Sequence, residues 1–320
     1  MEVQNSMAKS IAQERRDYDE TCKRILAERQ IRARILHDYV SEFSNTNIAA
    51  IESMLDDEVE VGTEPIGRDD WAAYSVGGHE RNTEDSTLAE GVARFDVRFS
   101  VPIPGKGSRM TIEVDLEAQN KWDVGYPLAS RAVFYCARML SMQGDKILPK
   151  SEYEKLNKVY SVWVCSHPDK EHKGVVEQFS MRPHSDRESL MFDGYDLMDV
   201  CFICLDSHKI SAEDGCLGLL GALFALRCDP KELRRILADD FGMIMTESID
   251  ERVEAMCNFS EGIWEDGKAE GRAEGRAEAL RSLMASLSIG IERAMELLCI
   301  PSSERERYES LLARYSTSGR

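Results

Sequence analysis

The stretch that decides the fold is Arg94-Phe95-Asp96-Val97-Arg98-Phe99, followed after a short turn by Met110-Thr111-Ile112-Glu113-Val114-Asp115-Leu116-Glu117-Ala118-Gln119. Both segments alternate apolar and polar residues, which is the period of a strand with one buried face. The expected buried faces are Phe95, Val97 and Phe99 in the first strand, and Ile112, Val114, Leu116 and Ala118 in the second. Prolines and glycines between Pro102 and Gly107 predict the turn of a hairpin. Pairing of the two strands would bring Asp96 beside Glu117.

Two carboxylates that meet across neighbouring strands have a chemical use. Oxygen ligands of this kind bind Mg²⁺ or Mn²⁺, and such a cation activates water for hydrolysis. The alternative is an exposed polar strand face, because Glu113 and Asp115 show that the second strand carries further acids.

An Asp on one strand and Glu-x-Gln on the next resembles the PD-(D/E)xK nuclease superfamily, whose usual signature ends in Lys. More narrowly, the chain resembles the bacterial recombination-promoting nuclease / transposase family over residues 23–300. The stretches that carry this likeness, in order, are 32–43 (RARILHDYVSEF), 116–119 (LEAQ) with 125–135 (GYPLASRAVFY), 158–165 (KVYSVWVC) and 267–275 (GKAEGRAEG).

The resemblance implies an α/β fold of the restriction-endonuclease type, with a mixed-sheet core and a helical C-terminal extension. It implies Mg²⁺ or Mn²⁺ as cofactor and DNA as substrate. The implied metal ligands are Asp96, Glu117 and the carbonyl of Ala118. Gln119 stands where the superfamily usually has Lys, and Lys121, at the same strand parity, is a candidate for the missing ammonium. Phe95 stands where the superfamily's motif usually has Pro.

Two helices are expected to contribute further residues to this site. Superfamily members commonly add an acid from the first helix, and Glu42 continues the apolar face of a helix expected up to residue 44; Glu84 and Glu90 are weaker alternatives. The resemblance implies that a helix expected over residues 128–142 flanks the site. Its residues Arg131, Tyr135 and Arg138 share one face and are candidate DNA contacts. The alternative is a solvated Arg and a half-buried Tyr.

Charge limits how the chain can bind DNA. The formal net charge is −18, whereas affinity for nucleic acid comes mainly from Lys and Arg that neutralise phosphates. Residues 121–160 nevertheless hold seven basic and four acidic residues, a local balance of +3. We therefore expect modest, salt-sensitive binding.

Composition points to a cytoplasmic protein that does not enter membranes. No apolar run approaches the ~20 residues that span a bilayer, and the N-terminal residues lack the apolar core of a signal peptide. The nine cysteines are scattered and fit a reducing compartment. Cys201 and Cys204 form C-x-x-C, but residues three apart on a strand face opposite sides, so they should not chelate one metal.

The patterns divide the chain into five segments. These are a flexible N-terminus (1–22), a nuclease-like core (23–206), a helical subdomain (207–264), a Gly-Lys/Arg-Ala-Glu repeat connector (265–280) and a helical tail (281–320). Further strands are expected at residues 59–61, 158–165, 175–181 and 197–205. The repeat is either a flexible connector, as its glycines favour, or a helix that packs along its Gly/Ala stripe in a homo-oligomer. The tail is either a protein-contact or structural module, or a DNA-reading helix-turn-helix. Its acidic residues favour the first, because they would repel DNA phosphates.

These observations predict a metal-dependent DNA endonuclease of a transposase- or recombination-associated family, which hydrolyses phosphodiester bonds. The alternative is a catalytically inactive protein that keeps the nuclease fold and acts as a protein-interaction module. Gln119 and the acidic net charge favour this alternative.

Overall fold

The computed structural model describes residues 2–56, 59–62, 84–87, 90–105, 110–120, 122, 124–144, 151–182, 194–301, 305, 308 and 312. The chain forms two compact units, Met1–Phe259 and Ser260–Arg320. Residues 207–264 are predicted to form a helical subdomain packed on the sheet, and those of them up to Phe259 belong to the same unit as the sheet. Within the described ranges, no helix combines the length and the apolarity needed to cross a bilayer.

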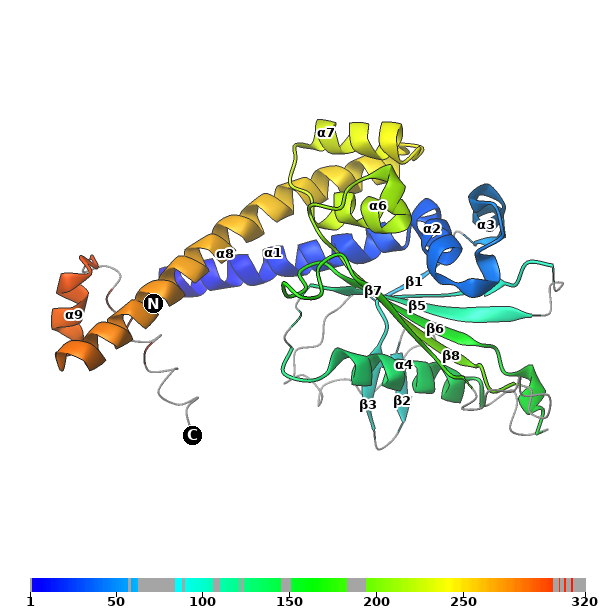
Figure 1. The fold of residues 1–320 in the computed structure, drawn as a ribbon, viewed down its shortest axis with the longest axis horizontal. Coiled ribbons are helices and arrows are strands. Elements are labelled where there is room, and N and C mark those ends of the chain that lie inside the picture. The colour runs from blue at the N-terminus through cyan, green and yellow to red at the C-terminus, as the bar shows by residue number, and fades with distance from the viewer. Residues whose placement is uncertain are drawn as a thin grey trace. The chain divides into compact units, whose positions relative to one another are not determined.

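The first unit is built on a six-stranded mixed sheet (Figure 1). Its strands, in spatial order, are β1 (Glu60–Val61), β4 (Val97–Pro102), β5 (Thr111–Gln119), β6 (Val159–Cys165), β8 (Met198–Cys204) and β7 (Val176–Ser180). Strands β5, β6 and β8 run parallel, and β1, β4 and β7 are antiparallel to their neighbours. The predicted α/β class is therefore confirmed. A separate two-stranded sheet, β2 (Glu84–Thr87) with β3 (Glu90–Arg94), was not predicted.

Helices cover both faces of the large sheet (Figure 1). The helix α4 (Leu128–Met142) lies on one face, and its bounds match the prediction. Residues at helical spacing, Leu128, Ala132, Tyr135, Cys136 and Met139, pack there against β6 and β8. On the other face lie α1 (Glu2–Leu26), α2 (Arg29–Tyr39), α3 (Ile48–Met54) and α6 (Gly215–Phe224). Strand β6 is buried along its whole length because both of its faces are covered.

The N-terminal region differs from the prediction. Residues 2–26 form the helix α1 rather than a flexible tail, because Tyr18, Cys22 and Leu26, at intervals of four, give it a buried stripe. The single helix expected up to residue 44 is broken at Ala27 and resumes as α2. The side chain of Arg32, which is 1 % exposed, stabilises the break by donating from Nε to the Ala27 carbonyl at 2.8 Å.

The remaining elements of the first unit are helical. They are the short turns η1 (Ser41–Phe43), η3 (Tyr153–Lys155) and η4 (Ala212–Asp214), the helix α7 (Pro230–Arg235), the π-helical turn η5 (Ile236–Asp240) and the first part of α8 (Glu247–Leu287). Asp229 caps α7 by accepting from the amides of Lys231 and Glu232 at 2.9 and 3.1 Å.

The repeat is helical in the structure. Helix α8 runs unbroken through residues 267–278, which differs from the flexible connector that its glycines favoured. A Cβ added at Gly275 would meet no described atom within 4 Å, so close packing against the described residues does not require this glycine. In the second unit, the end of α8 and α9 (Ile291–Leu297) share a small core of Ala277, Leu280, Ala294, Met295, Ile300 and Tyr308.

Candidate active site

Asp96 lies in a bend between two strands and not inside one. Strand β3 ends at Arg94 and β4 begins at Val97. The bend shifts the alternation, so that Phe95 packs edge-to-face on Tyr135 of α4, with ring centroids 5.0 Å apart. Phe99 instead lies under the guanidinium of Arg32 from α2, on the other side of the sheet. The prediction that Phe95 shares a face with Phe99 is therefore wrong.

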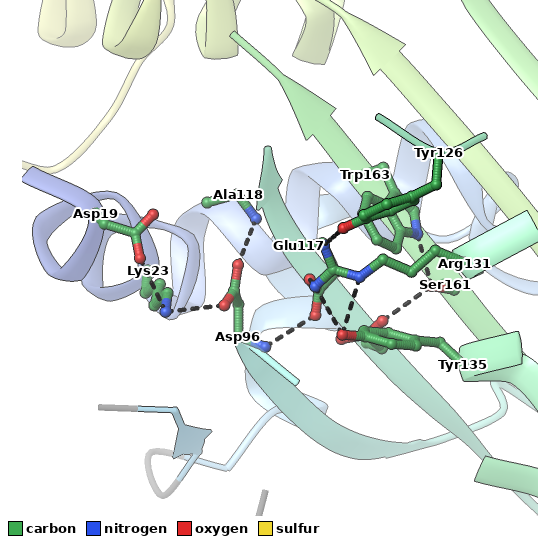
Figure 2. Close-up of polar contacts among 11 residues, drawn as sticks. Asp19, Lys23, Asp96, Glu117, Ala118, Tyr126, Arg131, Tyr135, Ser161 and Trp163 are labelled. Atoms are coloured by element: carbon green, nitrogen blue, oxygen red, sulfur yellow. Dashed lines mark hydrogen bonds and ion pairs between the residues drawn. The ribbon is translucent and has the colours of Figure 1, made fainter. Parts of the chain in front are cut away.

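The bend places the Asp96 carboxylate at the end of the β4–β5 ladder (Figure 2). Its Oδ2 accepts the amide of Ala118 at 2.9 Å. The carboxylate thus accepts a backbone amide of β5 just before β4 begins, where a strand carbonyl would otherwise be the acceptor. The amide of Asp96 in turn donates to Oε1 of Glu117 at 3.0 Å. The prediction that the hairpin brings Asp96 beside Glu117 is confirmed.

Glu117 and Asp115 are buried, which contradicts the alternative of an exposed polar strand face. Glu117 is 2 % exposed and Asp115 is fully buried. Oδ2 of Asp115 accepts the hydroxyl of Ser161 at 2.9 Å, and Ser161 Oγ accepts the indole N–H of Trp163. Oδ1 of Asp115 has no hydrogen-bond donor among the described residues. The Asp115 side chain also interacts with that of Glu117.

Both of these carboxyls hold a proton more readily than an exposed acid does. Burial raises the pKa of Asp115 to about 7, against an ordinary value of 3.8. Burial also raises the pKa of Glu117 well above its ordinary range, and the charges of Asp96 and Asp115 add to this effect. Two buried acids in contact avoid repulsion when one of them stays protonated.

Arg131 is a fixed cation on the α4 side of the site. Its Nε and one terminal nitrogen donate to the hydroxyl of Tyr135 at 3.1 and 2.7 Å. The same terminal nitrogen lies 3.4 Å from Oε2 of Glu117, and the other one donates to Tyr126 (Figure 2). The guanidinium carbon lies 5.0 Å from the ring centroids of both Tyr135 and Trp163. With 30 % of its side chain exposed, Arg131 can also meet a ligand from solvent.

Lys23 of α1 supplies a second cation that the sequence analysis missed. Its Nζ lies 2.9 Å from Oδ1 of Asp96 and 3.0 Å from Oδ2 of Asp19 (Figure 2). Burial works to lower the pKa of Lys23, but the two carboxylates outweigh it, so its pKa is raised and the side chain stays an ammonium. The sequence signal was a Lys within the apolar stripe of α1, directly after Cys22.

Glu42 is not part of this site, which corrects the prediction. Its Oε2 accepts the hydroxyl of Tyr160 at 2.5 Å, and its Oε1 lies 3.5 Å from Nζ of Lys158. Tyr160 and Trp163 are three residues apart on β6 and so face opposite sides of the sheet. The physical reason is that α2 ends at Tyr39, so the helical face does not continue to Glu42.

The remaining predicted residues have different outcomes. Arg138 and Tyr135 are 7 % and 6 % exposed, so neither offers the open surface expected of a DNA contact. Gln119 is 9 % exposed, and its carbonyl accepts the amide of Ser166. Lys121 lies outside the described residues, as do the side chains of Glu84 and Glu90. The structure therefore joins Asp96, Glu117, Ala118 and Arg131 of the predicted set, with Tyr135 bonded to Arg131.

The donor set suits a hard divalent cation only in part. Carboxylate and carbonyl oxygens are the right ligand type. Over the ranges that the structure describes, however, no group of three or more His, Cys, Asp or Glu side chains is arranged to hold a metal. Oδ1 of Asp96 faces Lys23, Oδ2 faces the Ala118 amide, and the two oxygens of Glu117 face the Asp96 amide and Arg131. A cation at Asp96 would therefore meet the Lys23 ammonium.

Comparisons with known proteins add no relative: the chain matches no protein-family model, no curated protein and no solved structure.

Proposed function

We propose that this chain is a metal-dependent DNA endonuclease of the PD-(D/E)xK type, acting in the cytoplasm in a transposase- or recombination-associated role. The observation that carries the proposal is the contact between Asp96 and Glu117 at the end of the β4–β5 hairpin. This contact lies on a mixed sheet, and α4 covers the face of the sheet that carries Glu117. The order of these elements is the one that the sequence resemblance implies.

Each residue has a chemical task in this proposal. Asp96, Glu117 and the Ala118 carbonyl would hold Mg²⁺ or Mn²⁺. When bound, the cation would polarise the scissile phosphate and lower the pKa of the attacking water. Arg131, oriented by the hydroxyl of Tyr135, would donate to a phosphate oxygen. Gln119 can only hydrogen-bond where a Lys would bring charge.

One feature of the site favours the second candidate, an inactive nuclease-fold protein that acts in protein interactions. All four oxygens of Asp96 and Glu117 already have protein donors. An inactive protein could use such ion pairs simply to stabilise its fold. The two candidates differ in metal binding and in cleavage, which can be measured directly.

The test is nicking of supercoiled plasmid with Mg²⁺ or Mn²⁺ by the wild type, Asp96→Asn and Glu113→Gln. Glu113 is the matched control because it lies on β5 with its carboxylate bonded to Ser100, away from Asp96. We expect Asp96→Asn to lose nicking by at least a hundredfold while keeping its circular dichroism spectrum, and Glu113→Gln to remain active. Equal nicking by folded Asp96→Asn would reject the assigned site, and no metal-dependent nicking by wild type would favour the inactive alternative.

A further inference from the structure

Lys23 differs from the other groups that contact the two central carboxylates, because its charge has a second carboxylate, Asp19, outside the Asp96–Glu117 pair. The amides of Ala118 and Asp96 belong to the backbone beside the β4–β5 ladder and cannot move away. Arg131 is fixed by bonds to the hydroxyls of Tyr126 and Tyr135. The Lys23 ammonium, by contrast, ends a four-carbon chain that comes from a separate helix.

Lys23 also has a second place to bind. It lies 3.0 Å from Asp19, which is one turn earlier on the same helix. An ammonium that leaves Asp96 therefore keeps one ion pair and stays beside the site. Because its side chain is 6 % exposed, its charge is poorly screened by water and acts strongly on anything that approaches Oδ1 of Asp96.

The charges around this point set up a competition. Asp19, Asp96, Asp115 and Glu117 together carry four carboxyl groups. Among the described residues, Lys23 and Arg131 form the ion pairs with these groups. A divalent cation bound at 2.0–2.6 Å from a carboxylate oxygen of Asp96 would lie within a few ångströms of the ammonium and be repelled by it.

We propose that Lys23 is a built-in counter-cation of the site, which a divalent cation must displace from Asp96 toward Asp19, so that Lys23 sets the metal affinity of the protein. This inference rests on the proposed function, since it takes Asp96 as a metal ligand. In the metal-free protein the ammonium compensates the charge of Asp96. In the metal-bound protein it rests on Asp19, still close to the reacting phosphate.

The experiment is calorimetric titration of the full-length protein with Mn²⁺ at fixed pH, with thermal unfolding as a second readout. The variants are Lys23→Met, Asp96→Asn and the control Arg24→Met. Arg24 is the next residue on α1; it pairs with Glu20 and has 57 % of its side chain exposed, so its substitution removes one positive charge outside the site. We expect Lys23→Met to lower the Kd for Mn²⁺ at least tenfold, Arg24→Met to leave it unchanged and Asp96→Asn to abolish binding.

The possible results separate this inference from the proposed function. If binding depends on Asp96 but Lys23→Met binds no tighter than wild type, the counter-cation is rejected and the metal site remains. If neither wild type nor Lys23→Met binds Mn²⁺ in an Asp96-dependent way, both proposals fall. Should Lys23→Met not fold, the double variant Lys23→Met/Asp19→Asn relieves the unpaired charge on α1, and it is expected to show the same tenfold gain.

Discussion

Replacing Asp115 with Asn should stabilise the protein at alkaline pH, because the buried carboxyl resists ionisation. Its pKa is about 7 in the folded chain and 3.8 in the ordinary, unfolded environment. Between these values the native state holds a proton that the unfolded state has released, so wild-type stability falls as the pH rises from 4 to 7. Asn lacks this titration, and its amide can still accept from Ser161 and donate to Glu117.

The size of the effect follows from linkage. Each pKa unit is worth about 1.4 kcal/mol. The pKa of Asp115 is about 7 in the folded chain and 3.8 in the unfolded chain. From pH 5.5 to pH 8, the folded state therefore loses stability equivalent to roughly one and a half pKa units. The stability advantage of Asp115→Asn over wild type should therefore grow by about 2 kcal/mol across this interval. The comparison uses the change with pH, so any fixed effect of the substitution cancels.

Urea unfolding at pH 5.5 and pH 8 measures this directly, with Glu113→Gln as the control on the same strand. Glu113 is half-buried and bonded to Ser100, so its substitution should not give the same rise. An advantage of Asp115→Asn that stays constant between the two pH values would mean that Asp115 is ionised throughout. The raised pKa of Asp115 in the folded chain would then be refuted.

Three further predictions concern single positions. Glu42→Gln should leave the Mn²⁺ Kd unchanged in calorimetry but lower the unfolding free energy by about 1 kcal/mol, since the bond from Tyr160 loses a charged acceptor; a weakened Kd would return Glu42 to the metal site. Arg131→Lys should reduce nicking tenfold or more without unfolding the protein, because one ammonium cannot reproduce the two bonds to Tyr135; unchanged nicking would remove Arg131 from the site. Gly275→Ala should raise the thermal stability of the helix by up to about 1 kcal/mol, since its Cβ meets open space; destabilisation would indicate packing against another chain.

The sequence predicted elements whose pattern is local. Alternation over residues 111–119 located β5, and apolar spacing located α4 to the residue. The contact of Asp96 with Glu117 followed from hairpin pairing, which local pattern also determines.

The sequence failed where distant or irregular contacts decide. Lys23 reaches Asp96 only because α1 packs against the large sheet, a contact between residues far apart in the chain. The prediction for Glu42 was wrong because the backbone becomes extended at Val40, at φ −116° and ψ 112°. No strong helix-stopping residue signals this change in the sequence. The bend at Asp96, which moves Phe95 to the α4 side, likewise has no glycine or proline to predict it.

The most direct test of the site is a crystal of the protein soaked in Mn²⁺, with anomalous scattering recorded to locate the ion. We expect one strong peak within about 2.5 Å of carboxylate oxygens of both Asp96 and Glu117, with Lys23 moved toward Asp19. An anomalous peak elsewhere, or an undisturbed Lys23–Asp96 pair at saturating Mn²⁺, would contradict it.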